Sequence, residues 1–272
     1  MRSINQDVEY LWLILIIAIG LALRAAAIGA FSHTPGSDEI AYQTMALNLV
    51  RGNGIVDSMG NLAMYNMGYP SFVLAPVFAL FGENILIARI LNALLGGLAI
   101  VLCYACAKEA GAGQIGRLFA AAMWALYIPA CVSVVYLLKE NLMIPLMLGV
   151  LWCALRVAKE PTCRTGLTCG GLFGFLALTG NAALSLSAPV LFALMSAPVD
   201  LSRKLSLSVG IFLSAVLITA PWMVRNMQAL GTPALNTISG RGPTASGGTG
   251  RSHAIRHAIA TQIFNWLRQV GE

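Results

Sequence analysis

YLWLILIIAIGLALRAAAIGAF, residues 10–31, carries a single charged side chain, Arg24. A helix needs about 20 apolar residues to cross the hydrocarbon core of a bilayer. The stretch therefore predicts a first transmembrane helix. It has no small-x-small site ahead of a polar mature domain, so we expect it to be retained and not cleaved as a signal peptide.

The composition extends this interpretation to the whole chain. Hydrophobic residues make up 58% of the 272 residues, and Asp, Glu, Lys and Arg together only 10%. Soluble domains carry roughly 25% charged residues, so a soluble protein is excluded. We predict an all-α polytopic membrane protein of about seven transmembrane helices, in which the first is followed by segments at 85–107, 118–138, 142–158, 165–183, 184–199 and 205–223.

The interval 32–84 is only patchily apolar and should contain juxtamembrane helices. SDEIAYQTMALNLV (37–50) predicts an amphipathic helix along the membrane surface, with Ser37 as its N-cap and Asp38 and Glu39 in its first turn. YPSFVLAPVFALFG (69–82) is too short and too interrupted by proline for a span, so we expect an interfacial or re-entrant helix.

Lysines and arginines in short loops favour a cytoplasmic N-terminus. The interval 32–84, the Lys139–Glu140 turn and the Gly180–Asn181 break then lie on the outer face, which we expect to be the periplasmic face of a bacterial inner membrane. The basic residues expected inside are Lys108, Arg117, Arg156, Lys159, Arg164, Arg203 and Lys204.

We expect two regions: a transmembrane module, residues 1–225, and an outer region, 226–272, with a Gly-rich loop (241–252) and a short amphipathic C-terminal helix. Of the residues behind the net charge of +6, five basic ones follow the last strong span with no acid before Glu272, which makes the tail a candidate anion-binding surface: Arg225, Arg241, Arg251, Arg256 and Arg268. No nucleic-acid recognition motif accompanies it, so no nucleic-acid partner is expected. The six cysteines lie in or beside spans and lack zinc-site spacing, which indicates packing and no metal site.

The polar residues near the outer face have two interpretations each. Arg24 and Arg89 either extend to the interface or pair with a lipid phosphate, and Arg24 has Asp38 as a further candidate partner. Asp38 and Glu39 are either dipole-favoured acids or a general base beside apolar walls. Lys139 and Glu140 form either a simple turn or a third carboxylate on the same face.

Several stretches resemble the GT-C membrane glycosyltransferases, in particular the protein O-mannosyltransferase-like branch (family 39 type) and the aminoarabinose transferases that modify lipid A. After the first span, the matching text is SDEIAYQTMALNLVRGNGI, GYPSFVLAPVFALFG, ARILNALLGGLAIVLCYACAK, YLLKENLMIPLMLGVLW and PWMVRN. The order and spacing run from residue 10 to about 250, although each motif is weak alone.

The resemblance implies a polyprenyl-phosphate sugar donor and an acid of the first outer loop as base. By motif position that acid is Asp38, with Glu39 beside it and Glu140 supporting the site. Arg24, Arg89 and Arg225 would hold the donor phosphate. We expect the substrate-binding residues to be Tyr42, Tyr65, Tyr69, Lys139 and Asn226.

We therefore expect an inverting glycosyltransferase that moves a sugar from a polyprenyl-phosphate donor to an acceptor hydroxyl on a glycan, lipid or protein at the outer face of the bilayer. Such a donor requires no cofactor. A divalent cation near Asp38 or Glu39 stays open, although three clear ligands are not visible. The alternatives are a polyprenyl-lipid transporter or flippase, and a non-catalytic membrane subunit with a partner transferase.

Two departures from the relatives matter. Some relatives have a lysine at the break between the fifth and sixth spans, where this chain has Gly180 and Asn181. Relatives also usually continue into further spans or a soluble domain beyond the position of Glu272. The chain is accordingly expected to be a minimal version, a fragment, one half of a complex, or a member that has lost activity.

Overall fold

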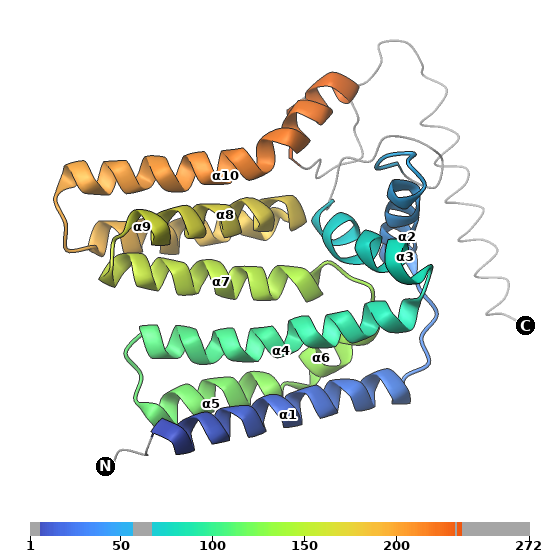
Figure 1. The fold of residues 1–272 in the computed structure, drawn as a ribbon, viewed down its shortest axis with the longest axis horizontal. Coiled ribbons are helices and arrows are strands. Elements are labelled where there is room, and N and C mark those ends of the chain that lie inside the picture. The colour runs from blue at the N-terminus through green and yellow to red at the C-terminus, as the bar shows by residue number, and fades with distance from the viewer. Residues whose placement is uncertain (1–5, 57–66, 232, 236–272) are drawn as a thin grey trace, which may run out of the picture. The chain divides into compact units, whose positions relative to one another are not determined.

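The computed structural model describes residues 6–56, 67–231 and 233–235, which form helices joined by turns and loops, with no β-strand among them (Figure 1). The predicted all-α class is confirmed. Tyr65, the Gly-rich loop 241–252 and the C-terminal helix lie outside the described residues. The bounds are α1 (Gln6–Ala30), α2 (Ser37–Val50), η1 (Pro70–Leu74), α3 (Ala75–Phe81), α4 (Ile85–Glu109), α5 (Gln114–Ala125), α6 (Ile128–Val132), η2 (Ser133–Val135), α7 (Glu140–Lys159), α8 (Cys163–Thr179), η3 (Asn181–Leu186), α9 (Ser187–Ser196) and α10 (Leu201–Leu230).

Fewer of the described helices are long and apolar enough to span a membrane than the sequence predicts. By length and composition, four described helices can cross a bilayer, namely α1, α4, α7 and residues Leu201–Ala229 of α10. A fifth is obtained if the bent pair α5 and α6–η2 forms one span. The expected segments 165–183 and 184–199 become α8, with 17 residues, and α9, with 10, which are short for full spans.

The segment expected as a span at 118–138 is bent by 54° between α5 and the pair α6–η2. Pro129 has no N–H, so it cannot donate to the carbonyl of Ala125 as a continuous helix would require. That carbonyl accepts instead from Arg24 Nη1 at 3.4 Å and from the Cys131 thiol at 3.3 Å. Side chains from elsewhere therefore satisfy the break that the proline creates.

The long helices pack side by side in the order α10, α8, α7 and α4, with α1 and α5 beyond (Figure 1). Close approach of α8 to α10 depends on glycines. A Cβ on Gly170 would overlap the carbonyl oxygen of Ile211 and lie 2.9 Å from its Cα, whereas one on Gly171 would be 3.5 Å from Ser214 Oγ, an ordinary contact. Small residues let helices approach within membranes.

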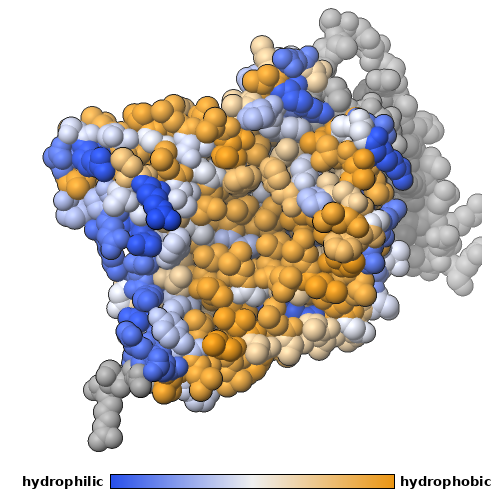
Figure 2. All heavy atoms as spheres, viewed as in Figure 1, coloured by the Kyte–Doolittle hydropathy of each residue, from blue (hydrophilic) through white to orange (hydrophobic). Residues whose placement is uncertain are grey.

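The apolar surface forms a broad band over these helices, with hydrophilic residues gathered along one edge where helices connect (Figure 2). The basic residues expected inside lie in or beside the α4–α5, α7–α8 and α9–α10 connections, together with Glu109 and Glu160. Arg156 pairs with Glu160 at 2.9 Å. The loops that precede α2, α4 and α7 lie at the other helix ends. The structure thus separates the same two groups of loops as the sequence interpretation.

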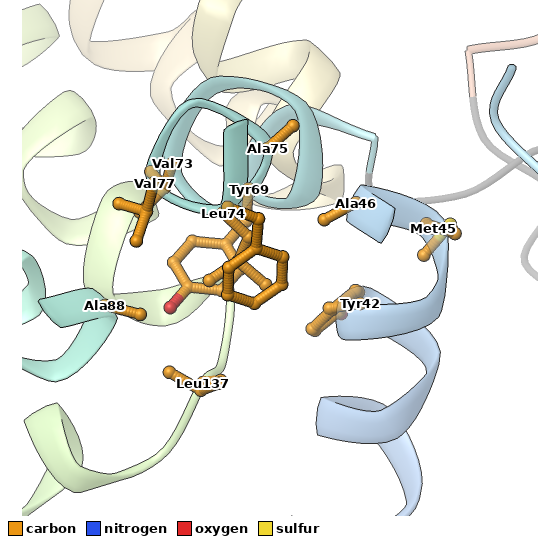
Figure 3. Close-up of a cluster of buried hydrophobic side chains, with 11 residues drawn as sticks. Tyr42, Met45, Ala46, Tyr69, Val73, Leu74, Ala75, Val77, Ala88 and Leu137 are labelled. Atoms are coloured by element: carbon orange, nitrogen blue, oxygen red, sulfur yellow. The ribbon is translucent and has the colours of Figure 1, made fainter. Parts of the chain in front are cut away.

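Helices α2, η1 and α3 fill the interval between α1 and α4 and share a hydrophobic core (Figure 3). Tyr42 of α2 and Tyr69, just before η1, meet edge to face with ring centroids 5.9 Å apart. The segment 69–82 forms η1 and α3, which are too short to span, as expected. This core fixes α2, and with it the acids of its first turn.

Candidate active site

The two adjacent acids of α2 have opposite environments. Asp38 is exposed, and its carboxylate makes no hydrogen bond or ion pair with the described residues. Glu39 is 4% exposed and accepts three hydrogen bonds. Its Oε2 accepts from the Gly36 N–H at 2.9 Å and from His33 Nε2 at 2.5 Å, and its Oε1 accepts from the Leu137 N–H at 2.7 Å.

These bonds set both the ionisation of Glu39 and the start of the helix. Burial alone would raise the pKa of Glu39, but the hydrogen bonds from Gly36, His33 and Leu137 outweigh it, so the pKa lies below the ordinary value. The N-cap is Gly36 and not Ser37, because Glu39 reaches back to the Gly36 N–H. The carboxylate of Glu39 therefore serves as a fixed anchor.

The short helix η2 and the non-helical loop between it and α7 are held by side chains. Asn92 Nδ2 donates to the carbonyls of Val134 and Tyr136 at 3.2 and 3.1 Å. Asn141 Nδ2 donates to the carbonyls of Ser133, Tyr136 and Leu138. Irregular backbone within a membrane protein needs such internal partners, so this segment is rigidly positioned against α4 and α7.

Arg89 links this segment to the loop before α2. Its Nε donates to the Val135 carbonyl at 2.8 Å, and its Nη2 donates to the His33 carbonyl at 2.9 Å. The His33 ring also contacts the Tyr136 ring, with centroids 4.5 Å apart. The sequence interpretation assigns Arg89 to the donor phosphate. In the structure its guanidinium holds together the two segments that flank the acid pair.

Lys139 and Glu140 lie at the start of α7, close to the acid pair, because Leu137 bonds Glu39. Lys139 is partly buried, and its ammonium has no hydrogen bond or ion pair within the described ranges. Its stem crosses Gly180, since a Cβ added to this glycine would lie 3.8 Å from Lys139 Cδ and Cε. The structure thus brings four of the predicted site residues to the same end of the helix bundle: Asp38, Glu39, Arg89 and Lys139.

Arg24 lies elsewhere. It is fully buried among α1, α4 and α5, and its Nη1 donates to the Gly20 carbonyl at 2.8 Å. Of the two interpretations of Arg24, extension to the interface is wrong, because Pro129 frees a carbonyl inside the fold that this guanidinium reaches. No described contact joins Arg24 to Asp38.

Arg225 and Asn226 lie near the end of α10. Arg225 donates to Asn226 Oδ1 at 2.8 Å and to the Ile55 carbonyl at 2.9 Å, and its guanidinium stacks 4.7 Å from the Trp222 ring centre. Ile55 follows the C-terminal end of α2, and α2 rises about 1.5 Å per residue. Arg225 therefore contacts the turn that follows α2, beyond the helix end that is away from Asp38. Asn226 is fully buried and donates to the Ala234 carbonyl.

Tyr42 and Tyr69 are predicted from sequence to contact substrate, but both are core residues, at most 1% exposed (Figure 3). The Tyr69 hydroxyl donates to Asn92 Oδ1 at 3.0 Å. Burial first, and then the nearby carboxylates of Glu39 and Glu140, raise its pKa. These rings shape the support of the site and offer no surface to a substrate in this structure.

Sequence reasoning misses His33, Asn92 and Asn141, which hold the acid pair and the loop before α7. Asn92 and Asn141 stand out as polar residues within apolar helices, a signal that the sequence does contain. His33 offers no such signal, because its partner is set by the turn between α1 and α2. No cluster of three metal-ligating side chains occurs in the part of the chain that the structure describes.

A family model described as dolichyl-phosphate-mannose-protein mannosyltransferase matches residues 69–224, more than half of the chain. The match includes Arg89, Asn92 and the start of α7, and it begins after α2. Comparisons with curated proteins and with solved structures give no match. The chain therefore belongs to the dolichyl-phosphate-mannose-protein mannosyltransferase family, and is a GT-C membrane glycosyltransferase.

Proposed function

We propose that the protein transfers a sugar from a polyprenyl-phosphate donor to an acceptor hydroxyl, with inversion, at the outer face of the membrane. One observation carries the proposal. Asp38 presents an exposed carboxylate, without a partner among the described residues, on a helix whose first turn is fixed by the buried carboxylate of Glu39. A base must be free toward the substrate and held in position by its support.

In the proposed reaction, Asp38 accepts the proton of the acceptor hydroxyl while the hydroxyl oxygen attacks the anomeric carbon. The bond from that carbon to the phosphate oxygen breaks, and its electron pair leaves with the polyprenyl phosphate. Negative charge grows on the phosphate in the transition state, where fixed cations stabilise it. Lys139 lies at this end of the helix bundle, and its ammonium has no partner among the described residues.

Lys139 also supports a specific assignment of the phosphate. The side chain crosses Gly180 at the break between α8 and η3, where some relatives have a lysine of their own. We propose that the Lys139 ammonium serves there as the main donor-phosphate cation. Glu39 and Arg89 then act as positioning residues, and the outer orientation is supported by the basic loops gathered at the opposite helix ends.

The donor class is tested with the purified protein reconstituted in vesicles. Radiolabelled mannose is supplied either as polyprenyl-phosphate mannose or as a nucleotide sugar, with a mixture of hydroxyl acceptors. We expect transfer from the lipid-linked donor alone, with other polyprenyl-phosphate sugars tested in the same assay. Transfer from the nucleotide sugar, or from none of the lipid-linked donors, would contradict the proposal.

A further inference from the structure

A small cavity lies inside the bundle at the bend between α5 and α6, and it is lined by both Arg24 and Glu140. Its volume is about 10 Å³, which is close to the room needed for one water molecule. The other lining residues include Trp124, Ser133 and Asn141. Most of the remaining lining residues are apolar, so the cavity is an apolar pocket between membrane-spanning helices into which a few polar side chains are brought.

The donors around this cavity are incompletely paired. Arg24 is fully buried, and its Nε and Nη2 make no hydrogen bond with the residues described. The indole Nε1 of Trp124 also has no partner among those residues. A buried N–H without an acceptor costs about 1–3 kcal/mol, and more for a charged group. Three such donors in one cavity indicate an acceptor inside it.

The helices around Arg24 leave room for its guanidinium. A Cβ on Gly96 would lie 2.5 Å from Arg24 Nε, so glycine at this position gives the side chain room. One edge of the guanidinium is used at Gly20 and Ala125, where Pro129 has freed the Ala125 carbonyl. The remaining N–H groups are left for the cavity that Glu140 also lines.

We infer that Arg24 and Glu140 form an internal ion pair bridged by one bound water molecule. The water accepts hydrogen bonds from the guanidinium and donates one to the carboxylate, which needs no direct contact between the two side chains. Glu140 is then a positioning residue that fixes the first turn of α7, next to Lys139. A buried cation requires such a counter-charge, because an unpaired charge in this medium is costly.

The inference is independent of the proposed reaction and is tested by thermal unfolding of the full chain in detergent micelles. Arg24→Met, Glu140→Gln and the double variant are compared. Each single change should lower Tm, by about 6–20 °C for Arg24→Met. The double variant should melt at or above Arg24→Met, because the amide removes the charge that the first change leaves unpaired.

A second buried pair provides the matched control. Glu9 is 3% exposed and accepts from the Tyr104 hydroxyl at 2.7 Å and from Arg117 Nη1 at 3.4 Å. The losses from Arg117→Met and Glu140→Gln should add, since they belong to different pairs. Additive losses for Arg24→Met and Glu140→Gln as well would overturn the inference.

A charge-specific rescue separates pairing from packing. Arg24→Lys should recover at least about half of the Tm lost in Arg24→Met when Glu140 is present. It should recover little in the Glu140→Gln background, where no carboxylate remains. Equal recovery in both backgrounds would show that Arg24 acts only by filling space. If Arg24→Met gives no folded protein, Arg24→Lys with Glu140→Gln provides the same cycle, and additivity there equally refutes the pair.

Discussion

Replacing Glu39 by Gln tests whether the buried acid is the anchor of the site. Glu39 Oε2 accepts two hydrogen bonds and Oε1 accepts one, from Leu137 at 2.7 Å. The amide keeps its oxygen where two donors converge and turns its NH₂ toward the Leu137 N–H. Two donors then face each other in a buried place, and the charge that strengthened the remaining bonds is lost.

The cost follows from these changes. An unsatisfied buried N–H costs about 1–3 kcal/mol, and the weaker neutral bonds add about 1 kcal/mol. The sum of about 2–4 kcal/mol corresponds to a Tm decrease of about 4–16 °C for a chain of this size. Asp38→Asn is the matched control, because the neighbouring exposed side chain has no partner among the described residues and the same chemical change should cost less than about 0.5 kcal/mol.

The difference between parent and Glu39→Gln should depend on pH. The pKa of Glu39 lies below its ordinary value in the folded protein. Its contribution is therefore fully present above the unfolded pKa of about 4.3 and is lost as the pH falls through the folded pKa. Differential scanning fluorimetry from pH 7 to 3 should show the gap narrowing below about pH 4.3. An equal Tm for parent and Glu39→Gln at pH 7, or an equal loss in Asp38→Asn, would refute the reasoning.

Three further changes test other parts of the account. Gly170→Ala places a Cβ against the backbone of α10 and should lower Tm by about 2–12 °C in the same assay. Gly171→Ala should change Tm little, and similar Tm values for the two variants would contradict the close contact between α8 and α10. Lys139→Met should weaken binding of the polyprenyl-phosphate donor about tenfold, measured by microscale thermophoresis. Lys108→Met, at the opposite end of the bundle, should leave donor binding unchanged, and equal effects of the two changes would exclude Lys139 as the phosphate cation. Ser37→Cys, in a background without native cysteines, should react with a membrane-impermeant maleimide added outside intact cells, and labelling only after lysis would reverse the proposed orientation.

The helix positions could be predicted from the sequence because an apolar run long enough to span a membrane can form few structures other than a transmembrane helix. The break near Leu126 could not be placed by hydropathy, although Pro129 is a local signal for it. The lengths of α8 and α9 depend on where the chain turns at Gly180, which apolar content alone leaves open. The predicted number of spans is therefore higher than the four or five that the described helices support.

The separate environments of Asp38 and Glu39 depend on the rotation of α2 about its axis. Glu39, Tyr42, Gln43 and Ala46 are buried and follow a helical i, i+3, i+4, i+7 pattern, so this signal is present in the sequence. The partners of Glu39 are not, because Leu137 is 98 residues away. Contacts of that separation are decided by packing and cannot be obtained from spacing.

The position of Arg24 is also decided by packing between segments that are far apart in the sequence. A lone arginine near a span end is compatible with an interfacial site, whereas the carbonyls of Gly20 and Ala125 and the room left by Gly96 favour the interior. Arg225 likewise follows the expected motif, but the turn after α2 determines which group it contacts. Residue types could thus be chosen from sequence, whereas their partners required the fold.

The most direct test of the central claim measures donor binding and sugar transfer on the same reconstituted samples of parent and Asp38→Asn. If Asp38 is the base, transfer should fall by about 10²–10⁴-fold, while donor Kd stays within about threefold and Tm is unchanged. Transfer at the parental rate in the folded Asp38→Asn variant would contradict the assignment of Asp38 as the base.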